Sequence, residues 1–228
     1  MNLKGKTRES KGYIVDEIHR FNILLDTREV YLHGHIDSEE GDSGVEYRMS
    51  NNFVKNMRLL ERLDNKKPIF VHQHSIGGEW AEGMMQYDAI STSQCPVVLI
   101  THGIAASMGS IIPQAADLRI SMPNCWWLIH DGYTDIDSSL TMKQSKSWAG
   151  WEEITGKQMR EIYVSSCKKA PIFEGKTPRS VLNYIEKRLS EREDWWLSSG
   201  EAVEHGFCDA VYGAEGYKTM EDLKTHVC

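Results

Sequence analysis

Apolar runs of strand length, alternating with segments of helical spacing, constrain the fold of this chain more than any other feature. The runs are residues 28–36, 67–74, 96–101, 118–121, 126–130 and 209–212, and the helical segments include 14–25, 50–63, 78–92 and 105–116. Consecutive strands joined through a helix run parallel, and such a sheet buries both of its faces. The order therefore predicts an α/β fold with a mainly parallel sheet and helices on both faces.

Length, charge and cysteine spacing exclude several classes of protein. The 228 residues suit one domain, and no run of about 18 apolar residues is present to cross a membrane. A net charge of −7 without a long basic run argues against nucleic-acid binding. The five cysteines are scattered and form no CxxC pair. This pattern is typical of reduced thiols, so we expect a cytoplasmic protein without a disulfide framework.

We expect a single domain over residues 1–228 with three peripheral segments. Residues 1–12 are charged and are predicted to be flexible. Residues 133–190 contain polar windows of helical spacing and are predicted to project from the α/β core, with Thr177 as the N-cap of one helix. The tail, residues 213–228, carries no readable motif.

Two loops that follow predicted strands contain residues suited to catalysis. Open α/β sheets place their sites at such strand ends. The first loop, His74–Gly78, contains a glycine pair that lets backbone N–H groups approach a ligand, although an ordinary turn has the same composition. The second, Gly103–Ser110, surrounds Ser107 with small residues, as at a nucleophile turn. It lacks the G-x-S-x-G form, so a small-residue packing patch is the alternative.

A serine nucleophile needs a base and a group that orients the base. His130 follows an apolar strand and is the candidate base. The sequence offers four candidates for the orienting carboxylate, and spacing does not choose among them: Asp131, Asp135, Asp194 and Asp209.

Histidines spaced two apart on two strands suggest a competing metal site. His33 and His35 share one face of a predicted strand, and His72 and His74 share one face of another. If those strands pair, four imidazoles converge on a Zn²⁺ ion. No H-E-x-x-H motif accompanies them, and we expect no metal at the catalytic site.

Four ordered blocks of sequence resemble the ClpP family, the proteolytic subunit of the ATP-dependent Clp protease. The family's Asn-Ser-Pro-Gly-Gly strand end is similar to residues 74–78, and its Gly-Gln-Ala-Ala-Ser-Met-Gly segment is similar to residues 103–109. A Pro-Asn…Ile-His block matches 123–130, and an Asp-x-x-hydrophobic-Ser-x-x-Glu-Ala block matches 194–202. The similarity covers residues 15–212.

The resemblance implies a role for each matched residue. Ser107 is the implied nucleophile, His130 the general base and Asp194 the orienting carboxylate. The N–H groups of Gly78 and Met108 are the implied oxyanion hole. The implied fold is a ClpP/crotonase-like β-α-β core with a protruding helical handle at 133–190.

The resemblance also implies partners. ClpP-like chains form heptameric rings that stack as a tetradecamer and act with an AAA+ unfoldase, without a cofactor. This chain has no G-x-x-x-x-G-K-[ST] motif of its own, so an unfoldase would be a separate protein.

The chain departs from the family pattern at several positions. Ile76 and His74 replace the Pro and the Asn before the glycine pair, and Glu193 reverses the charge of an Arg. The interval of 64 residues between His130 and Asp194 is longer than the family's.

These departures keep three alternatives open. They are an ATP-independent protease of the viral head-maturation type, an inactive structural ring subunit, and a crotonase-fold acyl-CoA enzyme.

Two tryptophan pairs flank the implied catalytic residues. Trp126 and Trp127 precede His130, and Trp195 and Trp196 follow Asp194. Since neighbouring strand residues point to opposite faces, we expect one Trp of each pair to be buried.

Overall fold

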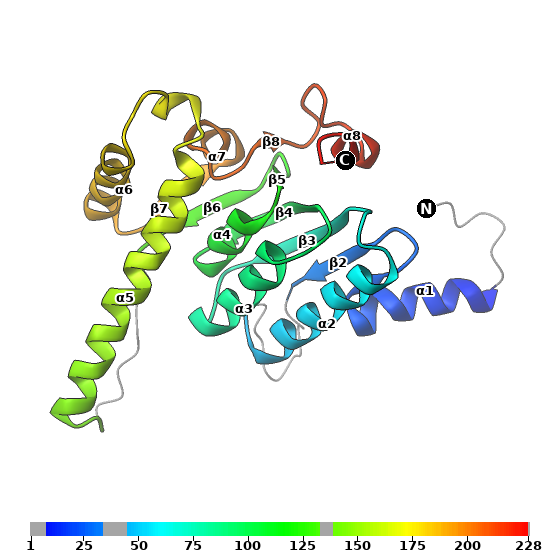
Figure 1. Cartoon of the computed structure of the whole chain (residues 1–228), viewed down its shortest axis with the longest axis horizontal. Helices are drawn as coiled ribbons and strands as arrows, with labels where there is room; N and C mark the ends of the chain where they lie inside the picture. Colours follow the sequence, from blue (N-terminus) through cyan, green and yellow to red (C-terminus); the bar gives the residue numbers. More distant parts are fainter. Residues whose placement is uncertain (1–7, 34–44, 133–138, 228) are drawn as a thin grey trace.

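The computed structural model describes residues 8–33, 45–132 and 139–227 and contains a mainly parallel sheet (Figure 1). The strands are β1 (Ile23–Leu24), β2 (Glu29–Leu32), β3 (Ile69–Ser75), β4 (Val97–Ala106), β5 (Leu118–Ser121), β6 (Trp126–Ile129), β7 (Trp195–Ser198) and β8 (Ala210–Val211). Strands β2, β3, β4, β5 and β8 are joined by parallel pairing, while β1 pairs antiparallel with β2 and β7 pairs antiparallel with β6. The predicted α/β class with a mainly parallel sheet is confirmed.

Helices connect these strands and extend beyond them. The α-helices are α1 (Arg8–Phe21), α2 (Tyr47–Leu63), α3 (Trp80–Ser91), α4 (Met108–Ile111), α5 (Met142–Cys167), α6 (Pro178–Arg192), α7 (Ser199–His205) and α8 (Met220–Thr225), and the 3₁₀ helices are η1 (Ile112–Ala115) and η2 (Pro171–Phe173). None of the helices in the described ranges is long and apolar enough to span a membrane.

Strand β4 changes its partner part-way along its length. Its first half, up to Thr101, pairs with β5, and its second half, from Ile104 to Ala106, pairs with β6. The register against β3 shifts between these halves, where Gly103 adopts a positive φ of 61°. The bulge bends β4, which lets β6 lie beside the end of β4 instead of continuing the sheet beyond β5.

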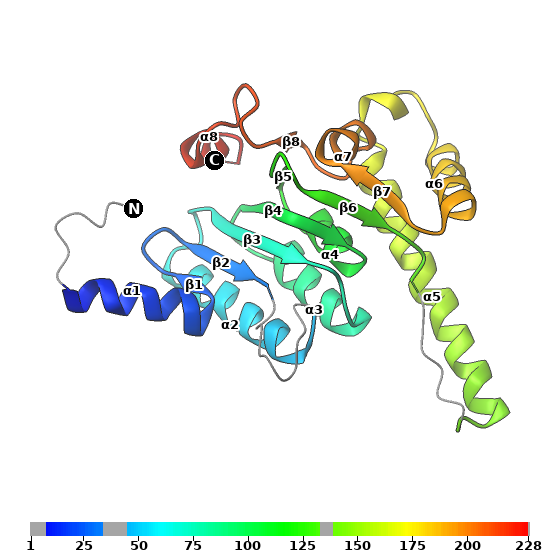
Figure 2. The same cartoon turned by 180° about the vertical axis from the view of Figure 1, so that it is seen from behind.

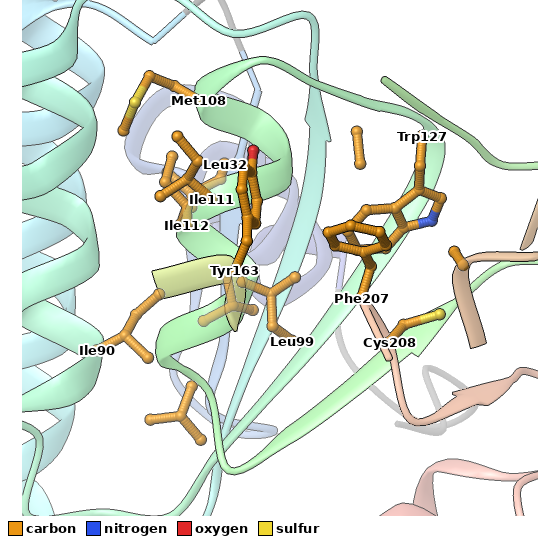
Figure 3. Close-up of a cluster of buried hydrophobic side chains, with 14 of the residues drawn as sticks. Leu32, Ile90, Leu99, Met108, Ile111, Ile112, Trp127, Tyr163, Phe207 and Cys208 are labelled. Carbon is orange, nitrogen blue, oxygen red and sulfur yellow. The ribbon is translucent and has the colours of Figure 1, made fainter. Parts of the chain in front are cut away.

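The two faces of the sheet are covered differently. Helices α2, α3 and α4 cover one face, over a large apolar core that extends to the base of α5 (Figure 3). The other face holds a smaller cluster that includes Phe70, Ile100 and Ile120, covered by the fully buried Leu223 of α8. Figure 2 shows α8 on the side of the sheet away from α2 and α3. The predicted helical cover on both faces is therefore present, and the tail supplies part of it.

The long helix α5 projects away from the sheet (Figure 1). It has 26 residues and begins with a capping box between Thr141 and Gln144. Helix α6 returns along its base, and its predicted N-cap is confirmed, because the Thr177 side chain accepts a hydrogen bond from the Ser180 N–H. Helix α5 lies inside the segment 133–190 that the sequence predicts to project, and α6 begins inside it and ends at Arg192, two residues beyond it.

The tryptophan pairs divide between core and surface as predicted. Trp127 and Trp195 are 0% and 4% exposed, while Trp126 and Trp196 are 53% and 43% exposed. The buried indole of Trp127 donates its Nε1–H to Ser121 Oγ over 3.1 Å. One face of the β6–β7 ribbon therefore belongs to the core.

Several predicted boundaries were wrong, each for a local reason. Residues 23–24 are a strand instead of the end of a helix, because they pair with β2. The helix predicted over 105–116 begins only at Met108, because pairing with β6 keeps β4 extended to Ala106. Helix α2 begins at Tyr47 instead of residue 50, because the Glu46 carboxylate caps it by accepting from the Arg48 and Met49 N–H groups.

The cysteines in the described part of the chain form no disulfide bond with one another. Cys95, Cys125, Cys167 and Cys208 are all free and buried. Cys228 lies outside the described residues.

Candidate active site

Ser107 occupies a strained turn between β4 and α4. Its φ of 53° and ψ of −127° lie in a region that residues with a Cβ rarely adopt. Its N–H donates to the Leu128 carbonyl of β6 over 3.0 Å. Its own carbonyl accepts from both the N–H and the Oγ–H of Ser110, at 2.8 and 2.6 Å. The turn is thus held from both sides, and such held strain is common at functional sites.

Both residues of the glycine pair are packed too closely to admit a Cβ, and Gly77 lies directly against Ser107. A Cβ on Gly77 would lie 2.5 Å from the Ser107 Cβ, and a Cβ on Gly78 would lie 2.2 Å from the Val45 carbonyl oxygen. Both glycines have positive φ, of 104° and 148°. No other residue fits either position without displacing backbone or the candidate nucleophile.

Backbone pairing orients the N–H of Gly78. Val45 donates its N–H to the Gly77 carbonyl over 2.5 Å and accepts from the Glu79 N–H over 3.1 Å. Because the two ends of a trans peptide point in opposite directions, the Gly78 N–H points away from Val45. The Met108 N–H is likewise opposite the anchored Ser107 carbonyl, at the start of α4, where helix N–H groups lack an internal partner.

Strand register brings His130 and Asp194 together. Strands β6 and β7 are antiparallel with Ile129 opposite Trp195, so the next residue of β6 and the preceding residue of β7 are also opposite each other. The His130 Nδ1 and Asp194 Oδ1 atoms are 3.7 Å apart, with side-chain exposures of 16% and 58%. This distance is longer than the 2.7–2.9 Å of a charge-assisted hydrogen bond.

The second ring nitrogen of His130 is buried. Its Nε2 has no hydrogen-bond partner among the described residues. His130 is two positions beyond Leu128, whose carbonyl binds the Ser107 amide, and two strand residues span about 7 Å. No serine–histidine hydrogen bond is formed among the described residues, and such bonds commonly tighten only when a substrate is bound.

The other candidate carboxylates have different partners. Asp131 pairs with Arg160 at 2.7 Å, and Asp209 pairs with the buried Arg119. Asp135 lies outside the described residues. Of the three candidates that the structure describes, Asp194 is the one that pairs with His130.

The predicted histidine metal site does not assemble in the part of the chain that the structure describes. Strands β2 and β3 do pair, but His72 Nδ1 lies 3.0 Å from His102 Nε2, and His74 Nδ1 lies 2.9 Å from the His102 carbonyl. The other nitrogen of His72 lies 3.5 Å from Glu29. Within the described ranges no group of three or more ligands could hold a metal ion. His35 lies outside the described residues.

The cluster around His72 and His74 also contains His102, which the sequence patterns did not identify as a candidate. His102 sits at the bulge of β4, and the bulge could not be predicted from spacing alone. Burial, with the nearby His72 and His74, lowers the pKa of His102 from 6.5 to about 4. The adjacent His72 imidazole is the largest influence on the Glu29 carboxylate and lowers the pKa of Glu29 to about 2.

Comparison with known proteins agrees with this geometry. The family model described as "Clp protease" matches residues 15–215. The chain belongs to the Clp protease family. The predicted family and the predicted serine-peptidase activity of the Clp type are both confirmed.

Individual relatives of this Clp-type chain are distant. It is 29% identical to the ATP-dependent Clp protease proteolytic subunit 2 of Treponema denticola, over 92% of this chain and 95% of the relative. It is 27% identical to the ATP-dependent Clp protease proteolytic subunit of Streptococcus uberis, over 73% of this chain and 80% of that relative. A point mutant of ClpP1 from Listeria monocytogenes superposes with a TM-score of 0.67 at 22% identity, covering 88% of this chain and 96% of that one. The predicted ClpP/crotonase-like fold is confirmed.

Gly77→Ala tests the packing of the Clp-type site. The new methyl group would push the Ser107 side chain aside, and a displacement of about 1 Å at a reacting atom costs on the order of 10²-fold in rate. We expect peptidase activity to fall by at least that factor while the folded state persists. Gly200→Ala, where the added methyl meets nothing within 4 Å, is the matched control. Unchanged activity in Gly77→Ala would contradict the described packing.

The free energy of unfolding should decrease as pH is lowered, because of His102. Its pKa is lower in the folded state than its ordinary value, so the unfolded chain takes up the proton first as pH falls. We expect the free energy of unfolding in urea to decrease from pH 6.5 towards pH 4. The dependence should be weaker in His102→Gln. Glu29 adds a loss in the same direction below pH 4.5, so the variant is compared above that pH.

Proposed function

We propose that Ser107 is the nucleophile, His130 the general base and Asp194 the orienting carboxylate of a peptide-bond hydrolase. The N–H groups of Gly78 and Met108 bind the oxyanion. The observation that carries the proposal is the pairing of β6, which binds the Ser107 amide through Leu128 and ends opposite Asp194. One strand therefore links all three side chains.

Acylation follows from this placement. The Ser107 Oγ attacks the substrate carbonyl carbon as His130 Nε2 accepts the hydroxyl proton. The carbonyl oxygen becomes an oxyanion that receives the two backbone N–H bonds. The tetrahedral intermediate collapses when the C–N bond breaks, and His130 returns the proton to the leaving amine. The product is an ester between the substrate acyl group and Ser107.

Deacylation repeats these steps with water as the nucleophile. Water loses a proton to His130 Nε2, its oxygen bonds to the acyl carbon, and the ester bond to Ser107 Oγ breaks as the proton returns to that oxygen. Asp194 accepts the His130 Nδ1–H, which leaves Nε2 free as the base. The chemistry uses only side chains and backbone of this chain, so it needs no cofactor and no metal.

We also propose that the chain works inside a ring-shaped oligomer. Helix α5 projects from the core and exposes large apolar side chains: Met142, Trp148, Trp151 and Ile154. The Trp148 and Trp151 ring centroids lie 5.5 Å apart. Apolar patches of this kind mark surfaces that contact other proteins. Membership of the Clp protease family supports the proposal that these oligomers are heptameric rings that stack as a tetradecamer.

A separate AAA+ unfoldase is the proposed partner for folded substrates. The relatives are named as subunits of an ATP-dependent protease, and this chain contains no phosphate-binding motif of the G-x-x-x-x-G-K-[ST] type. A cytoplasmic location stays a prediction.

An ATP-independent protease on the same fold is the second candidate. Glu193, at the C-cap of α6, takes the place of a family arginine immediately before Asp194 and has a positive φ of 53°. A carboxylate there carries the opposite charge and cannot donate the hydrogen bonds of a guanidinium. This favours an assembly that differs from the stacked heptamers.

Labelling with a fluorophosphonate probe tests the assignment. The wild-type protein should be labelled and Ser107→Ala should not, because the probe bonds to the nucleophilic oxygen. Asp194→Asn should retain its fold and lose about 10⁴-fold in peptide turnover, since the imidazole tautomer is no longer fixed. Persistent labelling of Ser107→Ala would overturn the assignment. A stable ring with no labelling or turnover would favour a structural subunit.

Native mass spectrometry separates the two assemblies. For the ring with a separate unfoldase, we expect the wild-type protein to be a tetradecamer. We expect the double variant Trp148→Ala and Trp151→Ala to lose the contact between rings and separate into single rings. A different oligomer that cleaves a folded substrate without ATP would support the second candidate.

A further inference from the structure

The handle helix reaches the turn of the nucleophile through a buried hydroxyl. Tyr163 lies in the last turns of α5 and is fully buried. Its hydroxyl lies 2.7 Å from Ser110 Oγ, and Ser110 Oγ donates to the Ser107 carbonyl over 2.6 Å. Figure 3 shows the Tyr163 ring within the core cluster, together with Ile111 and Phe207.

Proton counting fixes the direction of this chain of hydrogen bonds. A carbonyl cannot donate, so the single hydroxyl proton of Ser110 goes to the Ser107 oxygen. Ser110 Oγ then accepts from Tyr163, which must donate. Burial raises the pKa of the Tyr163 hydroxyl, so the donor keeps its proton over the working range. Donor chains of this kind strengthen each successive bond.

The anchored oxygen belongs to the peptide that carries an oxyanion donor. The Ser107 carbonyl and the Met108 N–H are the two ends of one planar trans peptide. Fixing the oxygen from inside the core therefore fixes the direction in which the N–H points. The strained φ of Ser107 makes such an anchor necessary, because the turn would relax towards a common conformation without it.

We propose that Tyr163 and Ser110 are positioning residues that aim the Met108 N–H at the oxyanion. This inference rests on Ser107 being the nucleophile, as proposed above. Tyr163 touches no reacting atom and acts through Ser110. The proposal gives the base of the handle helix a direct part in catalysis, in addition to its packing.

Tyr163→Phe is the first test, because it removes one oxygen and keeps the ring. With a short fluorogenic peptide we expect kcat to fall about tenfold, less than the 10²–10³-fold for outright loss of an oxyanion donor, while KM stays the same. The affinity for a peptide boronate, whose tetrahedral adduct uses the same N–H groups, should fall by a similar factor. Tyr184→Phe is the matched control, since the Tyr184 hydroxyl bonds to His205 and has no contact with the nucleophile turn.

A double-mutant cycle separates positioning from stability. Ser110→Ala should lower kcat at least as much as Tyr163→Phe, and the double variant should lower it no further. The melting temperature of the double variant should exceed that of Ser110→Ala, because Ser110→Ala alone leaves the Tyr163 hydroxyl buried and unpaired. Losses in kcat that multiply in the double variant would contradict a single chain. A lower melting temperature with unchanged kcat in Tyr163→Phe would contradict the proposal and show that Tyr163 contributes only to packing.

Hydrogen exchange provides a readout that needs no activity. In the full chain, the amides of residues 107–111 should exchange faster in Tyr163→Phe than in Tyr184→Phe. Unchanged exchange there would overturn the proposal. Absence of fluorophosphonate labelling in the wild-type protein would instead count against Ser107 as the nucleophile, so the two failures are distinct.

Discussion

The hydrogen bond from the Ser107 amide to the Leu128 carbonyl is the interaction on which the site depends. It ties the turn after β4 to β6. Strand β6 in turn carries His130 at its end and pairs with β7 beside Asp194. The relative positions of the proposed nucleophile, base and carboxylate are thus set by strand pairing, which is more rigid than the packing of loops. Loss of the β6 register would displace all three at once.

Much of the fold and the site could be predicted because the informative signals are local. Apolar runs located the strands, and the glycine pair and Ser107 marked the strand ends where parallel sheets place their sites. The choice of Asp194 was different. Spacing alone left four carboxylates open, family resemblance selected one, and the β6–β7 register gives the physical reason.

The missed features depend on contacts between residues distant in sequence. Strand β4 changes partner because β6 replaces β5 beside its second half. No pattern within residues 96–106 indicates this change. His102 joined a cluster with Glu29 and His72 only because the bulge turns it towards β3. Tyr163 and Ser110 are 53 positions apart. Periodicity reports which face a residue occupies, but not which distant group it meets.

The tail has a consequence for the behaviour of the chain in water. The family match ends at residue 215, yet α8 lies beyond it and buries Leu223 against Phe70, Ile100 and Ile120. A chain truncated after the matched region would expose this hydrophobic surface to solvent, and exposed hydrophobic surfaces promote aggregation. Residues 216–227 therefore cover this hydrophobic cluster, and any shortened version of the protein would need another cover for it.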